Sequence, residues 1–150
     1  MTHRKYTAAP HSSIPLNHLH SLISISTYNL TATTKLIMDY LWDFPEGTSF
    51  REIYKHFTEV KGRDWKRQTL YTYLTILMEQ GFLRTEGSRR RTTYIPAISR
   101  DAYREFHAKE ILEDAYDNSL VKFVTAYAKS DNITKEDADA IIAILNDTVK

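Results

Sequence analysis

One stretch of the sequence, from Arg67 to Thr75, carries side chains that could contact a nucleic acid. Large aliphatic residues recur within it at the spacing of a helical stripe, so the other positions share the opposite face. That face has one cation, several short hydrogen-bonding groups and no carboxylate: Arg67, Gln68, Tyr71, Thr72 and Thr75. It can approach phosphates and base edges without charge repulsion. We interpret it as a DNA contact, with an ordinary solvated helix face as the alternative.

A second cationic segment follows this helix. Arg89, Arg90 and Arg91 are consecutive and come directly after Gly87-Ser88, a turn signal. Neighbouring arginines repel one another, and binding of a polyanion relieves that repulsion by counterion release. The triplet is interpreted as a contact to a phosphate backbone, and a solubilising turn is the alternative.

The helix, predicted over 65–80, is defined by its buried side. Its stripe has the i, i+4, i+7, i+8 spacing and consists of Leu70, Leu74, Leu77 and Met78, and Gly81 closes the helix. Two strands, Phe82–Glu86 and Arg91–Ile95, then flank the arginine-rich turn. A polar-faced helix followed by a basic hairpin is typical of a winged helix-turn-helix. In that fold the helix enters the major groove and the wing meets the backbone.

Two shorter helices precede this unit. The first has one apolar face, Ile37, Tyr40, Leu41 and Phe44, and ends at Pro45–Gly47. The second begins at a capping box formed by Ser49 and Glu52, and it buries Ile53 and Phe57. A cap at Asp64 is expected to start the third helix. This order predicts a winged-helix domain over 31–98, in a protein that is mainly α with a small β-hairpin wing.

After Pro96 the chain becomes acidic, and its pattern predicts a three-helix region over 99–150. The helices begin near Ser99, Ser119 and Thr134, and Thr134 with Asp137 forms a capping box. Three short helices cannot bury their apolar stripes on one another completely, so a second copy is the expected partner. The residues assigned to dimerisation are Phe106, Leu120, Phe123, Val124, Tyr127, Ile141, Ile142 and Leu145.

Charge is distributed unevenly along the 150 residues. Net charge is only +1, but residues 1–100 carry 14 Lys and Arg against 8 Asp and Glu, and residues 101–150 carry 6 against 11. A basic first part and an acidic last part indicate that only the first part meets a polyanion.

No apolar run is long enough to span a membrane. The chain has no cysteine, which fits a reducing cytoplasm.

Residues 1–30 are less informative. They mix prolines with Ser, Thr and His and hold no acidic residue, so we expect a poorly ordered or loosely helical arm. A DNA-touching arm and a targeting segment are the alternatives.

No enzymatic site is predicted. The carboxylates at Glu110, Glu113, Asp114 and Asp117 have helical spacing but no accompanying nucleophile or glycine-rich loop, so neither a cofactor nor a metal site is expected.

Several of these pieces resemble the penicillinase repressor (BlaI/MecI) family over about residues 31–147. They are Leu41-Trp42, Trp65 with Thr69-Leu70-x-Thr72, Leu77-x-x-x-Gly81-Phe82, and Tyr94 with Pro96. The resemblance implies a DNA-binding transcriptional regulator that dimerises through its carboxyl-terminal helices. It also implies that the family's base-reading and phosphate-binding positions fall on Gln68, Thr69, Tyr71 and Thr72.

The sequence departs from the family pattern in four places. Lys66-Arg67-Gln68 replaces the usual Ser-Pro-Lys, and Ile76 stands where arginine is common. Penicillinase repressors are cleaved at an Asn-Phe bond by a sensor-linked metalloprotease, but the corresponding place, Lys109–Leu112, lacks that pair. The cysteine cluster of copper-responsive relatives is also missing. The operator sequence, the inducing signal and a regulatory protease as partner therefore stay open.

Together these observations predict a homodimeric, sequence-specific transcriptional repressor. It would bind an inverted-repeat operator of double-stranded DNA through the helix at 65–80 and the wing at 87–91. The rival prediction is a winged-helix adaptor that binds an acidic protein partner and does not read DNA sequence. An activator on the same scaffold is a further alternative.

Overall fold

The computed structural model describes residues 30–130 and 133–149 of the chain. The predicted arm at 1–30 lies outside the described residues except for its last position. The chain divides into two compact units, of which the first ends at Arg104 and the second begins at Glu105. The described residues contain no helix that is long and apolar enough to cross a membrane.

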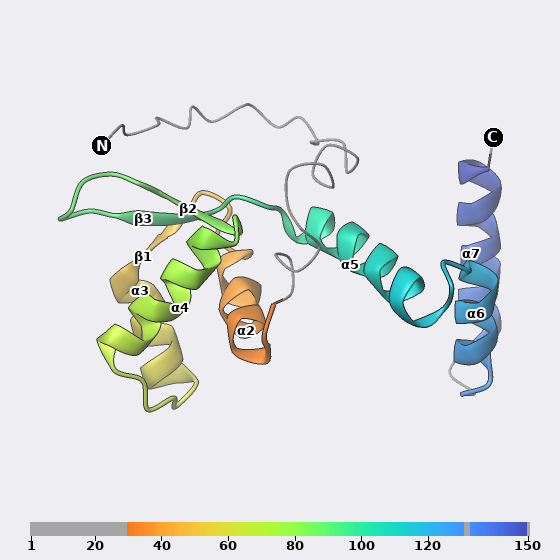
Figure 1. Ribbon diagram of the computed structural model, residues 1–150, viewed down its shortest axis with the longest axis horizontal. Helices are drawn as coiled ribbons and strands as arrows, with labels where there is room; N and C mark the ends of the chain where they lie inside the picture. The colour runs from red at the N-terminus through yellow and green to blue at the C-terminus, as the bar shows by residue number, and fades with distance from the viewer. Residues whose placement is uncertain (1–29, 131–132, 150) are drawn as a thin grey trace. The chain divides into compact units, whose positions relative to one another are not determined.

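The first unit contains three helical segments and a small sheet (Figure 1). Its elements are α2 (Ala32–Leu41), β1 (Thr48–Ser49), α3 (Phe50–Lys55), the π-helix η2 (His56–Val60), α4 (Arg67–Glu79), β2 (Leu83–Glu86) and β3 (Thr93–Pro96). Helix α5 (Arg100–Ala115) begins in this unit and ends in the second. The order of three helical segments followed by a hairpin is the predicted one, and the predicted mainly α fold with a small wing is confirmed.

The core of the first unit is built by the predicted helical stripes. Leu70, Leu74 and Leu77 of α4 are completely buried, while Met78 is half-buried. The partners with no exposed surface in α2 and α3 are Ile37, Met38, Leu41 and Ile53. Because i and i+4 positions lie on one side of a helix, the spacing in the sequence was sufficient to locate these buried faces.

The first helix is shorter than its apolar pattern predicted. It ends at Leu41, so Phe44 lies beyond it and is 40% exposed. The Tyr40 ring contacts Phe44 at a centroid distance of 4.9 Å and stacks on His56 at 4.0 Å. The helix therefore ends three residues earlier than expected. It is followed by turn hydrogen bonds, such as the one of 2.9 Å from the Phe44 N–H to the Leu41 carbonyl oxygen.

The sheet has a strand that the sequence did not reveal. Its order is β1-β3-β2, all antiparallel, with Thr48 opposite Tyr94 and Leu83 opposite Pro96. Strand β1 has only two residues, too few for an alternating pattern to be visible. It runs directly into α3, where the Ser49 hydroxyl accepts a hydrogen bond of 3.2 Å from the Glu52 amide, which is one half of the predicted capping box.

The start of α4 differs from the prediction. The residue before its first turn is Lys66, whose side chain makes no capping hydrogen bond, so the expected cap at Asp64 is wrong. Trp65 just before it is fixed by tertiary contacts. Its ring stacks on Phe57 at 5.0 Å, and the Tyr54 hydroxyl donates a hydrogen bond of 2.9 Å to its carbonyl oxygen. These tertiary contacts, in place of a local cap, orient the start of the helix.

The second unit contains the end of α5 together with α6 (Leu120–Ala128) and α7 (Lys135–Thr148). Both later helices begin near the predicted residues, and each has an N-terminal cap. The Ser119 hydroxyl accepts from the Lys122 amide, and Thr134 forms a reciprocal capping box with Asp137. Neither α6 nor α7 has a single buried residue, although both carry large apolar side chains.

Candidate nucleic-acid interface

Helix α4 presents the predicted polar face to solvent. Arg67, Gln68, Tyr71, Thr72 and Thr75 are exposed, and Thr69 is half-buried. None of them pairs with a carboxylate among the described residues, whose six salt bridges all lie elsewhere. The face is therefore accessible and free of negative charge, which favours its approach to a phosphate backbone.

Thr72 has a more restricted role than its hydroxyl suggests. Its Oγ1 donates a hydrogen bond of 2.9 Å to the carbonyl oxygen of Gln68, one turn earlier. The single hydroxyl proton is thus engaged within the helix. What remains for a ligand is an acceptor oxygen and a methyl group, and the latter suits apolar contact with a thymine methyl.

The wing is a hairpin with a well-defined turn. Strands β2 and β3 pair from Leu83–Pro96 to Glu86–Thr93. The chain then turns through Gly87, whose φ of 96° and close approach to the Arg91 carbonyl exclude a side chain. The Arg91 amide donates to the Ser88 carbonyl at 2.9 Å, which closes the turn.

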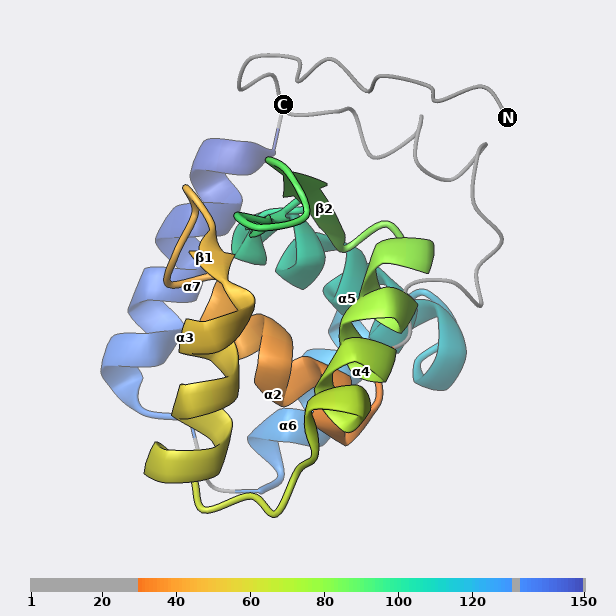
Figure 2. The same ribbon diagram turned by 90° about the vertical axis from the view of Figure 1, so that its left-hand side faces the viewer.

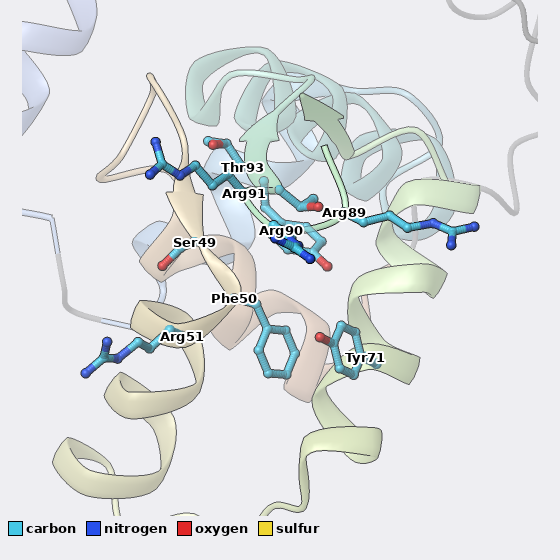
Figure 3. A pocket seen from close by; sticks show the side chains of 10 residues that line it. Ser49, Phe50, Arg51, Tyr71, Arg89, Arg90, Arg91 and Thr93 are labelled. Carbon is cyan, nitrogen blue, oxygen red and sulfur yellow. The ribbon is translucent and has the colours of Figure 1, made fainter. Parts of the chain in front are cut away.

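The three arginines of this turn are all exposed and reach in different directions. In Figure 3, Arg89 extends to the side of α4, Arg91 extends to the opposite side, and Arg90 lies between them. Arg89, Arg90 and Arg91 form no salt bridge with any carboxylate in the part of the chain that the structure describes. Three unpaired cations spread over the wing tip are suited to contact successive phosphates of a nucleic-acid backbone.

A groove of about 630 Å³ separates the wing from the helices. The residues that line it come from three segments that are distant in sequence. Figure 2 shows the backbone of these segments from the side of α3 and α4. Its lining residues are Ser49, Phe50, Arg51, Tyr71, Arg89, Arg90, Arg91, Thr92, Thr93 and Tyr94. We call this the wing groove. The start of α3 lies beside the wing in this groove, and no local pattern in the sequence indicates that proximity.

The floor of the wing groove is aromatic and uncharged. The rings of Phe50 and Tyr71 stack at a centroid distance of 3.9 Å and an interplanar angle of 13° (Figure 3). Tyr94 is only 6% exposed, and burial, with a smaller contribution from Tyr71, raises the pKa of its hydroxyl. The phenol therefore stays protonated at neutral pH, and the groove gains no negative charge from it.

The residues assigned to dimerisation are mostly uncovered. Exposed fractions are 46% for Leu120, 49% for Tyr127 and 56% for Ile142, while Phe123 is half-buried. The others on α6 and α7, Val124, Ile141 and Leu145, are also exposed. Phe106 differs, since it is 8% exposed and already buried within the chain.

No group of three or more His, Asp or Glu side chains within 30–130 and 133–149 is arranged to hold a metal ion. Glu113 and Asp114 of α5, and Asp117 just after it, are exposed to solvent, and Glu110 is half-buried. The described geometry is thus that of an accessible cationic surface on the first unit and an uncovered apolar surface on the second.

Comparison with known proteins gives one match. A family model described as penicillinase repressor matches residues 30–147, which is nearly the whole described chain. No curated protein matches the sequence.

Proposed function

The chain belongs to the penicillinase repressor family of DNA-binding transcriptional regulators, and from this premise we propose that it is a homodimeric repressor of an inverted-repeat operator. In this proposal α4 reads base edges in the major groove, and the wing at 87–91 contacts the phosphate backbone. It acts in the cytoplasm, where its DNA target is, and an occupied operator excludes the polymerase.

The observation that carries the proposal is the combination of α4 and the wing on one cationic surface. Arg67 lies on the exposed face of α4, and Arg89 to Arg91 line a groove that Tyr71 of the same helix also lines. Since no carboxylate of the described chain neutralises these cations, their charge is available to a polyanion. A helix in the major groove would bring the wing against the flanking backbone.

The uncovered apolar side chains of α6 and α7 support association of two copies. Large aliphatic residues such as Ile142 and Leu145 are 56% and 41% exposed in the single chain. Removal of such surface from water is favourable by about 25 cal/mol per Å². A two-fold dimer would use the same surface on both copies, and it predicts two half-sites in inverted orientation.

Two of the four departures from the family pattern concern the inducing signal. The place that corresponds to the family's cleavage site, Lys109–Leu112, lies within the regular helix α5 and has no Asn-Phe pair. We therefore propose the DNA-binding activity without the family's proteolytic switch.

The test is a fluorescence titration of the full chain with a labelled random duplex at several salt concentrations. If a dimer makes about six to ten phosphate contacts, affinity falls roughly a thousandfold or more between 50 and 200 mM salt. An adaptor that binds an acidic protein would show no binding to the duplex at micromolar protein and low salt. That result would overturn the proposed function.

A further inference from the structure

Three aromatic rings form a continuous stack between α3 and α4. Phe50 stacks on Tyr71 at 3.9 Å and on Tyr54 at 5.9 Å, with interplanar angles of 13° and 11°. The outer member on α4, Tyr71, is 43% exposed, whereas Phe50 in the middle is 9% exposed. The rings of Phe50 and Tyr71 face each other below the wing in Figure 3. One exposed ring of the candidate DNA surface therefore rests on a buried ring from another helix.

The same stack also holds the cation of α4. The guanidinium carbon of Arg67 lies 5.2 Å from the ring centroid of Tyr54 and 5.9 Å from that of Phe50. Both distances fall within the range of attraction between a cation and an aromatic ring. Arg67 and Tyr71 are four residues apart on α4, so they are neighbours on one face, and Phe50 is the contact they share.

A shared rigid contact matters for recognition because long side chains lose rotamer freedom when they bind. A side chain already held in one orientation loses less of that freedom, and the binding site is then preorganised. We propose that Phe50 is a positioning residue for DNA recognition, which holds Tyr71 and Arg67 in the orientation that discriminates between base sequences. This inference rests on the proposed function, and it adds a specificity determinant on α3 that itself touches no base.

A second buried aromatic residue offers a matched comparison. Phe57 is 3% exposed, and its ring contacts are Tyr40, His56 and Trp65. None of these is on the exposed face of α4. Phe57 thus contributes to the same core and reaches the start of α4 through Trp65, with no ring contact to Tyr71. Its replacement measures the effect of a loosened core and helix start while the ring beneath Tyr71 is kept.

The experiment compares Phe50→Met and Phe50→Leu, which remove the ring, with Phe50→Tyr, which keeps it, and Phe57→Leu. Methionine fills much of the volume of phenylalanine and limits the loss of packing. Duplexes enriched from a random pool by the unchanged protein serve as the selected DNA, and the starting pool serves as random DNA. The readout is the ratio of the two affinities at fixed salt, at a temperature where circular dichroism shows every variant folded.

We expect both ring-free variants to lower this ratio about tenfold, which is about the discrimination that one specific base contact contributes. The dependence of affinity on salt should stay unchanged. Phe50→Tyr keeps the ratio. Phe57→Leu lowers the unfolding midpoint but also keeps the ratio. In the free protein, ring-current shifts of the Tyr71 ring protons should be lost in Phe50→Met and retained in Phe57→Leu, an NMR measurement that needs no DNA.

Two negative results are distinguishable. If the unchanged protein enriches no duplex and binds no random DNA, the proposed function fails, and this inference fails with it. If the unchanged protein discriminates and the ring-free variants discriminate equally well, only the positioning role of Phe50 is overturned. Equal losses in Phe50→Met and Phe57→Leu would also overturn it, because they would show a general effect of the core.

Discussion

The indole Nε1 of Trp42 donates a hydrogen bond of 2.8 Å to the carbonyl oxygen of Ile98. The bond joins the end of α2 to the segment that leads into α5, across 56 positions of sequence. Two residues of α5 also contact this indole. The ring of Tyr103 lies 5.2 Å away, and the guanidinium of Arg100 lies 5.7 Å from its centroid. Trp42 is therefore the point at which the first unit fixes the start of α5.

Replacement of Trp42 by phenylalanine should destabilise the first unit. It leaves the Ile98 carbonyl without its donor, a loss of about 1 to 3 kcal/mol in the free energy of unfolding. Urea denaturation followed by circular dichroism measures it. The control is Trp65→Phe, which also shortens an indole but removes no hydrogen bond that the indole makes to a described residue. Equal losses in the two variants would contradict the role of the bond.

Replacement of Arg89, Arg90 and Arg91 by alanine should weaken binding to all duplexes alike. Phosphate contacts carry no base information, and each one lost lowers the slope of log affinity against log salt by about 0.9. Salt titrations with selected and random duplexes measure both effects. Replacement of Lys109, Lys129 and Lys135 by alanine is the charge-matched control in the acidic part of the chain. An unchanged slope in the arginine variant would exclude the wing as a phosphate contact.

Gln68→Ala should reduce discrimination and leave random binding nearly intact. An exposed amide can make two hydrogen bonds to an adenine edge, and its loss costs about 1 to 3 kcal/mol at the base it reads. Competition between the selected duplex and single-base variants of it locates that position. If Gln68→Ala and the wing variant behaved identically, the assignment of reading to α4 and anchoring to the wing would be wrong.

Ile142→Glu should dissociate the proposed dimer. The side chain is 56% exposed in the single chain, and an interface that covered it would bury an uncompensated carboxylate in the variant. Sedimentation equilibrium at micromolar concentration should report the mass of one chain in place of two. Asn146→Glu adds the same charge at an exposed polar position of α7 and is the control. A variant that kept the mass of two chains would exclude this face.

Stability should depend on pH through His56. Burial against Tyr40 and Phe57, with a smaller contribution from Lys61, lowers the pKa of His56 from its ordinary value of 6.5. The unfolded chain then binds more protons than the folded one, so this stabilisation is present above pH 6.5 and is lost as pH falls through the folded pKa.

The measurement is the difference in urea midpoint between pH 7 and pH 5, in the unchanged protein and in His56→Phe. The phenylalanine keeps a ring against Tyr40 but cannot be protonated. The unchanged protein should lose more stability on acidification than the variant. An equal loss would mean that other groups account for the pH dependence.

Local patterns were sufficient for the secondary structure that carries the candidate site. The stripe of Leu70, Leu74 and Leu77 located the buried side of α4, and thereby its exposed polar face, because a helix separates its two faces by a fixed angle per residue. Glycine at Gly87 likewise indicated the wing turn. The cap expected at Asp64 failed because Tyr54 and Phe57, from another helix, fix the start of α4 through Trp65.

By itself, then, the sequence determined which segments are helices, which faces of them are buried, and where the cations of the wing stand. Only the tertiary structure placed Phe50 beneath Tyr71 and Trp42 against Ile98, and only it revealed the two-residue strand β1 beside β3. The physical reason is the separation along the sequence between the residues that interact. Helical stripes and turns are encoded by neighbours within a few positions, whereas these contacts join distant segments whose proximity depends on how the whole core packs.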